Sequence, residues 1–176
     1  MKNLLAFSRQ SQPQRSQVQA NLVVQRAMQL VSHQFELSQT VLLAELDPSL
    51  SEILCDAGQL QQVLIVLLVN AGEALGKGGE IVIRTAPLTG SEGILISVKD
   101  SGPGIPEALH HQIFEPFFST KDSQHRTGLG LAVAKGIVDR HGGTIAVHSA
   151  PGRGAEFVIH MPLHAPAAQA AEGMAT

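Results

Sequence analysis

One segment constrains the fold of this chain more than any other: residues 57–75, AGQLQQVLIVLLVNAGEAL, form a long and mostly apolar stretch. Asp56, followed three residues later by Gln59, is the capping-box pattern that opens a helix. Glycines within residues 76–79 then end it, because glycine readily takes the left-handed backbone of a helix end. The pattern predicts a long apolar helix that packs against other parts of the chain. The amide of Asn70 interrupts this helix and must find partners.

Other segments supply the layers against which this helix can pack. Apolar residues at helical spacing predict a second helix from about residue 16, a third helix at 129–141 and a short helical patch at 107–114. Five segments have the composition of strands: 40–47, 80–85, 93–100, 143–149 and 155–161. Short connections make the second and third of these an antiparallel pair and the last two a terminal hairpin. This order predicts an α+β fold with helices on one face of a mixed sheet.

Composition excludes several classes of function. The chain has 176 residues, of which 44% are hydrophobic and 15% charged, as expected for one globular domain. A net charge of −3 and the lack of a Lys/Arg stripe argue against a nucleic-acid partner. The longest apolar run, 63–69, is far short of the roughly 20 residues of a bilayer span, and no signal peptide is visible. We therefore expect a cytoplasmic domain without membrane contact, in which the single cysteine, Cys55, is a core residue.

Asp100 is the first candidate for a binding residue. It ends the strand expected at 93–100, and because side chains alternate with period two it lies on the apolar face of that strand. A carboxylate on this face is costly unless it receives hydrogen bonds. It either caps the glycine turn that follows or accepts a bond from a ligand amine, such as that of adenine. In the second case Gly102 and Gly104 let the backbone approach the flat base.

Asn70 and the start of the third helix are further candidates. The Asn70 amide either bonds a neighbouring loop or, with triphosphate oxygens, completes the octahedral shell of Mg²⁺. Glu73, one turn further on, either holds a water in that shell or is a solvated surface residue. At the start of the helix expected at 129–141, free backbone N–H groups and the helix dipole favour an anion. Lys121, in the preceding aperiodic loop, either reaches a phosphate or is solvated.

Four motifs in unbroken order resemble the catalytic, ATP-binding domain of sensor histidine kinases in the GHKL superfamily. The N box is resembled by QQVLIVLLVNAGEAL, the first glycine box by DSGPGI, the F box by FEPFFSTK and the second glycine box by TGLGLAVAKGIVDRHGGTI. The segment PGRGAEFVIHMP is similar to the terminal hairpin of the same domain. The match covers residues 16–163 and is most like the nitrogen-regulation branch of these kinases. Four ordered motifs are far more specific than one glycine-rich loop.

The resemblance implies a two-layer α/β sandwich of the GHKL (Bergerat) type that binds ATP and Mg²⁺. Adenine would lie against Asp100, and Asn70 would ligate Mg²⁺. A lid over residues 119–127 would cover the phosphates and would be anchored on apolar surface by Phe114, Phe117 and Phe118. The residues implied in ATP binding are Asn70, Asp100, Gly102, Gly104, Ile105, Lys121, Thr127, Gly128, Leu129, Gly130 and Leu131.

The phosphoacceptor histidine of the family has no counterpart in this sequence. In the family that histidine is usually followed by Asp or Glu, and none of the eight histidines here is. The resemblance implies that the chain presents the γ-phosphate to a histidine on the separate dimerisation domain of the same kinase, with a response regulator downstream. We expect residues 1–15 to be the end of a truncated dimerisation helix and linker, 16–163 the catalytic domain and 164–176 a disordered tail. Membrane attachment of the full-length kinase stays open.

Two positions depart from the family pattern. Val66 stands where the N box usually has its first Asn, and Arg126 where the second glycine box often has another glycine. Arg126 either helps to neutralise phosphate or is solvated. These departures leave open a non-catalytic ATP-binding module of the GHKL type that signals through lid closure. A third alternative is an ATP-hydrolysing machine like the chaperone and topoisomerase relatives, but Val66 lacks the lone pair of the carboxylate that they carry there.

Overall fold

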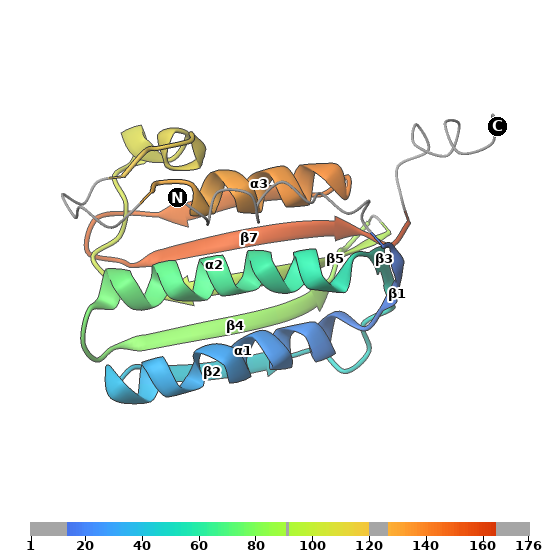
Figure 1. Ribbon diagram of the computed structural model, residues 1–176, viewed down its shortest axis with the longest axis horizontal. Coiled ribbons are helices and arrows are strands. Elements are labelled where there is room, and N and C mark those ends of the chain that lie inside the picture. Colours follow the sequence, from blue (N-terminus) through green and yellow to red (C-terminus); the bar gives the residue numbers. More distant parts are fainter. Residues whose placement is uncertain (1–13, 91, 120–126, 165–176) are drawn as a thin grey trace, which may run out of the picture.

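The computed structural model describes residues 14–90, 92–119 and 127–164, which form two layers (Figure 1). One layer is a sheet with the strand order β2-β4-β5-β7-β6. Its strands are β2 (Val41–Leu46), β4 (Glu80–Pro87), β5 (Gly93–Asp100), β6 (Thr144–Ser149) and β7 (Ala155–Pro162). The other layer contains the helices α1 (Ala20–Leu37), α2 (Ala57–Leu75) and α3 (Gly130–Arg140), which cover one face of the sheet. The expected α+β sandwich is confirmed.

The sheet is mixed, as the sequence predicts. Strands β4 and β5 are antiparallel, with Ile83 opposite Val98, and β6 and β7 form the expected antiparallel hairpin. Strand β2 pairs with β4 in parallel, so the chain must cross over between them. Helix α2 provides that crossover and lies against β5 in the middle of the sheet.

The core lies between the helices and the inner face of the sheet. Leu64, Leu67 and Leu68 of α2 are among its fully buried residues, and they share one hydrophobic core with alternate residues of the central strands, as a two-layer fold requires. Gly72 allows α1 to approach α2 closely, because a Cβ atom at this position would lie 2.5 Å from Cε1 of Phe35. Cys55 is fully buried, which confirms its expected place in the core.

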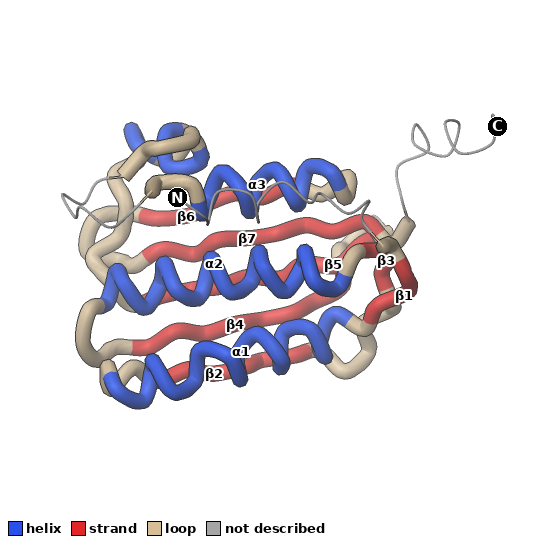
Figure 2. Tube along the Cα trace, viewed as in Figure 1, coloured by secondary structure: helices blue, strands red, loops and turns tan. Residues whose placement is uncertain are grey.

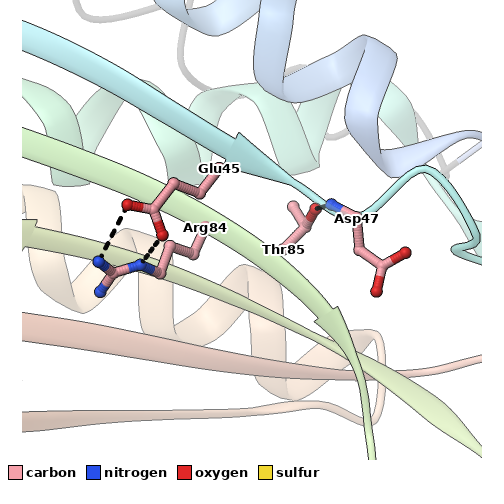
Figure 3. A network of polar contacts seen from close by, with 4 residues as sticks. All are labelled: Glu45, Asp47, Arg84 and Thr85. Atoms are coloured by element: carbon pink, nitrogen blue, oxygen red, sulfur yellow. Dashed lines mark hydrogen bonds and ion pairs between the residues drawn. The ribbon is translucent and has the colours of Figure 1, made fainter.

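The opposite face of the sheet is more polar near β2. Arg84 on β4 donates to the carboxylate of Glu45, its register partner on β2, from both Nε and Nη2 (Figure 3). At the end of the same strand pair, the Asp47 N–H donates to Oγ1 of Thr85 at 3.1 Å (Figure 3). The Thr85 hydroxyl in turn donates to Oδ1 of Asn21 on α1 at 2.8 Å. This chain of bonds ties the end of β2 to the helix layer.

One expectation about local structure is wrong. Residues 16–18 are a strand, β1 (Ser16–Val18), and the first helix begins only at Ala20, because β1 pairs with a short strand, β3 (Ile53–Cys55), that the sequence did not predict. Such distant pairing overrides the local helical pattern. The short helical patch expected at 107–114 is confirmed, as two single 3-10 turns, η2 (Glu107–Leu109) and η3 (Gln112–Phe114), since so short a segment hardly nucleates an α-helix.

These short elements mark the two ends of the helix layer. The β1–β3 pair lies at one end, beside the N-terminus of α2, and the 3-10 turns lie at the other (Figure 2). None of the described helices is both long and apolar enough to cross a bilayer.

Candidate functional site

A cavity of about 630 Å³ opens at the end of the molecule where the 3-10 turns lie. It is bounded by the C-terminal half of α2, the loop after β5, the first residues of α3 and the start of β7. A cavity of this size suits a small organic molecule. Eight of the eleven residues implied in ATP binding line it: Asn70, Asp100, Gly104, Ile105, Thr127, Gly128, Gly130 and Leu131.

Asp100 serves the turn and the cavity with different oxygens. Its Oδ1 accepts hydrogen bonds from the backbone N–H of Gly102 at 2.8 Å and of Ala155 at 3.3 Å. Its Oδ2 receives no hydrogen bond from a described residue, and the side chain lines the cavity. Burial raises the pKa of Asp100, and the two N–H donors offset part of that rise. The carboxylate therefore caps the glycine turn and keeps an acceptor for a ligand.

The glycines of this loop are required by contacts within the protein. Gly104 has φ +76°, and a Cβ atom there would lie 2.0 Å from the carbonyl oxygen of Ala150. A Cβ atom on Gly102 would lie 2.7 Å from Oδ1 of Asp100. At both positions a side chain would collide with other atoms of the protein. These glycines are therefore needed to form the turn itself, whether or not they also let a base approach.

Asn70 faces the cavity from α2. Its side chain is half-buried and makes no hydrogen bond to any described residue, so the reading of Asn70 as a structural amide that holds a nearby loop finds no support. Glu73, one turn further on, lines the same cavity. Amide and carboxylate oxygens are hard donors that suit Mg²⁺. No cluster of three or more His, Cys, Asp or Glu occurs among residues 14–90, 92–119 and 127–164, so an ion here would also need oxygens from a ligand.

Helix α3 begins at the cavity. Leu129, its N-cap residue, supplies no side-chain hydrogen bond to the first turn, and the first N–H groups of α3 donate to no described residue outside the helix, so an anion could accept from them. Val66 packs beside this helix start, because its Cγ1 lies 3.3 Å from the position of a Cβ atom on Gly130. The position of the usual N-box Asn thus adjoins both the helix start and, one turn later, Asn70.

The three phenylalanines of the F box behave differently from one another. Phe114 and Phe118 are half-buried and pack on the core, and the Phe114 ring meets Phe157 edge-on at 6.3 Å between centroids. Phe117 is 76% exposed and has φ +66°, so the expectation that it anchors the lid on apolar surface is wrong. Its N–H donates to the carbonyl oxygen of Gly128 at 3.0 Å, and the positive φ of this turn carries the ring outward.

The remaining residues from the sequence fall elsewhere. Gly102 and Leu129 adjoin the cavity without lining it. Lys121, Arg126 and most of the expected lid at 119–127 lie outside the described residues. Most of the apolar wall was not predicted; the residues that sequence reasoning missed include Val69, Ala74, Pro103, Leu109, Ile113, Ala155 and Phe157. Helical spacing around Asn70 and period two along 155–161 are the signals that could have identified several of these residues.

Comparisons with known proteins match this chain to one family. Residues 55–165 match the family described as histidine kinase-, DNA gyrase B- and HSP90-like ATPase. The chain is 40% identical over 164 residues to the signal transduction histidine-protein kinase AtoS of Escherichia coli K12, covering 93% of this chain and 26% of AtoS. It is also 40% identical to the sensory histidine kinase/phosphatase NtrB of Escherichia coli O157:H7, covering 80% of this chain and 42% of NtrB. The chain therefore spans less than half the length of these relatives.

Solved structures share the fold. The catalytic domain of histidine kinase ThkA superposes with a TM-score of 0.76 at 30% identity, covering 86% of this chain and 97% of that domain. Full-length ShkA in complex with AMPPNP gives a TM-score of 0.78 at 26% identity, covering 89% of this chain and 32% of ShkA. ThkA in complex with the response regulator TrrA gives 0.76 at 29% identity, covering 92% of this chain and 46% of that chain.

Proposed function

Because this chain belongs to the family of histidine kinase-, DNA gyrase B- and HSP90-like ATPases, we propose that it is the ATP-binding catalytic domain of a sensor histidine kinase. One observation carries the proposal. A single cavity brings together the Asp100 Oδ2, the Asn70 amide and the start of α3, none of which is hydrogen-bonded by a side chain of the part of the chain that the structure describes. The first suits an adenine amine, the second a magnesium ion, and the third a phosphate. The AMPPNP complex of ShkA and the kinase names of the relatives support this assignment.

The base would bind at the Asp100 side of the cavity. There Oδ2 accepts from the exocyclic amine of adenine, while the apolar residues Ile105, Leu109 and Ala155 contact the ring. Guanine carries an oxygen where adenine carries this amine, and that oxygen would face the carboxylate without a proton between them. The site is therefore expected to select ATP over GTP.

The phosphates would bind at the other side. The first N–H groups of α3, around Gly130 and Leu131, receive phosphate oxygens, and Lys121 of the expected lid adds a positive charge. Asn70 would ligate Mg²⁺, with Glu73 placed to hold one of its waters. Bound Mg²⁺ would offset part of the charge on the phosphates.

Transfer of the γ-phosphate needs few reactive side chains from this domain. Phosphoryl transfer depends mainly on positioning and charge neutralisation, which a rigid cavity with one helix start can supply. The nucleophile is a histidine of a separate dimerisation domain of the same kinase, and a response regulator receives the phosphoryl group downstream. The complex of ThkA with TrrA supports this order of partners. We place the domain in the cytoplasm, where its ATP is.

A mixing experiment tests the proposal. The chain is incubated with Mg·ATP labelled on the γ-phosphate and with the dimerisation domain of the same kinase, and acid-labile label is measured on that domain. We expect label when both are present, none with either alone, and none when the acceptor histidine is replaced by alanine. Full ATP binding without any transfer would contradict the kinase assignment.

The packing of Val66 against the start of α3 favours a second candidate, a non-catalytic ATP-binding module that signals through lid closure. Such a module would bind Mg·ATP and fail the transfer test. The same residue argues against a hydrolytic machine, because Val66 cannot act as a base. A missing general base typically costs about 10²–10⁴ in rate, so we expect negligible phosphate release from the chain alone.

A further inference from the structure

We propose that Ser149 is a positioning residue for the adenine end of this site. Ser149 ends β6 and does not line the cavity, yet it bonds the loop that does. The inference rests on the proposed binding of adenine at Asp100. It concerns how the cavity wall formed by Gly104 and Ile105 is held in place.

The hydroxyl of Ser149 bridges two segments. Its Oγ accepts a hydrogen bond from the backbone N–H of Ile105 at 2.7 Å and donates one to the carbonyl oxygen of Gly154 at 2.6 Å. Ile105 belongs to the loop after β5, and Gly154 to the turn that joins β6 to β7. One hydroxyl thus uses its proton and a lone pair to hold the loop against the turn.

Backbone groups complete the junction between this loop and this turn. The Gly152 N–H donates to the carbonyl oxygen of Pro103 at 2.7 Å, and the Ala155 N–H donates to Oδ1 of Asp100. A Cβ atom on Gly154 would lie 1.9 Å from the carbonyl oxygen of Asp100, which shows how closely the two segments approach. Among the described residues, the side-chain hydrogen bonds across this junction come from Asp100, which lines the cavity itself, and from Ser149, which does not. A substitution at Ser149 therefore changes the junction without removing a group that faces the cavity.

The bond acts on the cavity through two neighbours. Ile105 and Gly104 line the cavity, and Gly104 is wedged against the Ala150 carbonyl of the same turn. Without the hydroxyl, the Ile105 N–H loses its acceptor and the Gly154 carbonyl loses a donor, so the loop would have to shift to satisfy them. The wall would then move relative to Asp100. Among the described residues the Ser149 hydroxyl bonds only this loop and this turn, and it makes no hydrogen bond to the start of α3, where the phosphates are proposed to bind.

Replacement of the hydroxyl tests this role. In Ser149→Ala we expect the affinity for Mg·ATP, measured by calorimetry, to fall about 10-fold, as for the loss of a half-buried hydroxyl that leaves two backbone partners unpaired. The affinity for GTP, which does not use the Asp100 contact, should fall less. The ratio of ATP affinity to GTP affinity should therefore fall too, and competition against a fluorescent ATP analogue measures it. Ser149→Thr keeps the hydroxyl and should restore most of both values.

Ser32→Ala is the matched control, because the Ser32 hydroxyl bonds only the Gln29 carbonyl on the exposed side of α1. It should change neither affinity. Equal losses for ATP and GTP in Ser149→Ala would overturn the positioning role, and so would unchanged ATP affinity. If Ser149→Ala does not fold, Ser149→Cys, which keeps the size but bonds weakly, carries the same expectation. Absence of ATP binding by the unaltered chain would overturn the proposed function and this inference together.

Discussion

At the N-terminal end of helix α2, protein groups bond Asp56 on several sides, whereas toward the C-terminal end Asn70 faces the cavity without a partner among the described residues. The Asp56 Oδ1 accepts from the Gln59 N–H at 3.0 Å, and its Oδ2 accepts from the Gln14 N–H at 3.1 Å. Its own N–H donates to Nε2 of His141 at 3.1 Å. The N-terminal end of α2 is therefore held by hydrogen bonds to Asp56, and we call it the fastened end. At the other end, which we call the open end, the Asn70 side chain has no such partner among the described residues and is proposed to meet a ligand.

This difference leads us to expect that residues at one end of α2 stabilise the fold, whereas residues at the other end bind the ligand. The fastened end joins three elements. Gln14 precedes β1, Asp56 is the N-cap residue of α2, and His141 is the C-cap residue of α3. The His141 ring also bonds the Ile137 carbonyl through Nδ1 at 2.8 Å, and Nδ1 must carry the proton because Nε2 accepts from Asp56. Substitutions here should change the free energy of unfolding and spare ATP affinity. Substitutions around the cavity should do the reverse.

Replacement of His141 should have the largest effect. His141→Ala leaves a cavity in a buried site and the Asp56 N–H without its acceptor, so we expect a loss of about 2–4 kcal/mol in the free energy of unfolding. Urea titration measures it. His148→Ala, at an exposed position of β6, is the control and should lose less than about 0.5 kcal/mol. A similar loss in both variants would contradict the fastened end.

Replacement of Asp100 should act on the ligand and spare the fold. Asp100→Asn keeps an acceptor for the Gly102 and Ala155 N–H groups but faces the adenine amine with a neutral group. We expect Mg·ATP affinity to fall by about 1.5–3 kcal/mol, roughly 10- to 150-fold in calorimetry. Asp139→Asn, which removes only an exposed ion pair with Lys135, should bind ATP normally. Equal affinity in both variants would remove Asp100 from the site.

The same substitution should alter the pH dependence of stability. Burial raises the pKa of Asp100, so its carboxyl contributes most to stability below the unfolded pKa of about 3.9, and that contribution is lost as pH rises through the folded value. At neutral pH the ionised group opposes folding. Without nucleotide, Asp100→Asn should therefore be at least as stable as the unaltered chain at pH 7 and lose that advantage below about pH 4. Lower stability at pH 7, measured in urea, would contradict a destabilising carboxylate.

The fastened end can be probed more gently at Asp56. Asp56→Ala removes the N-cap bond to Gln59 and the bond to Gln14, which should cost about 1 kcal/mol of stability without change in ATP affinity.

The reactivity of the neighbouring Cys55 reports whether this end of α2 stays closed. Burial, aided by the charge of Asp56, raises the pKa of its thiol to about 11, so it should react slowly with thiol reagents in the folded chain. Asp56→Ala should label faster, and an unchanged rate would mean that the cap does not hold this end closed.

Replacement of Val66 should have the smallest effect. Val66 lies on α2 between the fastened end and Asn70. Val66→Asn places an amide one turn before Asn70 and beside Gly130, so Mg·ATP should bind about threefold more tightly and depend more strongly on magnesium. Val66→Ala separates the gain of an amide from the loss of valine packing. Tighter binding in both variants would show that the valine merely obstructs the site.

Sequence patterns predicted the features of this fold that depend on neighbours along the chain. Period two placed Asp100 on the core face of its strand, and the capping pattern placed the start of α2 correctly. The second arm of that capping box is absent: the Asp56 N–H bonds His141, and Oε1 of Gln59 is buried without a partner among the described residues. The sequence could not reveal this, because His141 lies 85 residues from Asp56.

Features that depend on distant partners or on backbone angles were missed. The bond from Ser149 to Ile105 spans 44 residues, and β1 pairs with a strand of only three residues. The sequence predicts that Phe117 packs on apolar surface, because its positive φ, which accompanies its exposure, cannot be read from the sequence. The two alternatives for Asp100 could not be separated from sequence, because the carboxylate has two oxygens: Oδ1 bonds the turn, while Oδ2 receives no hydrogen bond from a described residue and is the atom that we propose for the adenine contact.

Calorimetric titration of the unaltered chain with ATP and with GTP, each with and without Mg²⁺, tests the central claim most directly. The open end of α2 and the Asp100 carboxylate together predict saturable, magnesium-dependent binding of ATP at one site per chain, with GTP at least about 10-fold weaker. Binding of GTP as tightly as ATP, or no binding of ATP at all, would contradict the assignment of this cavity to an adenine nucleotide.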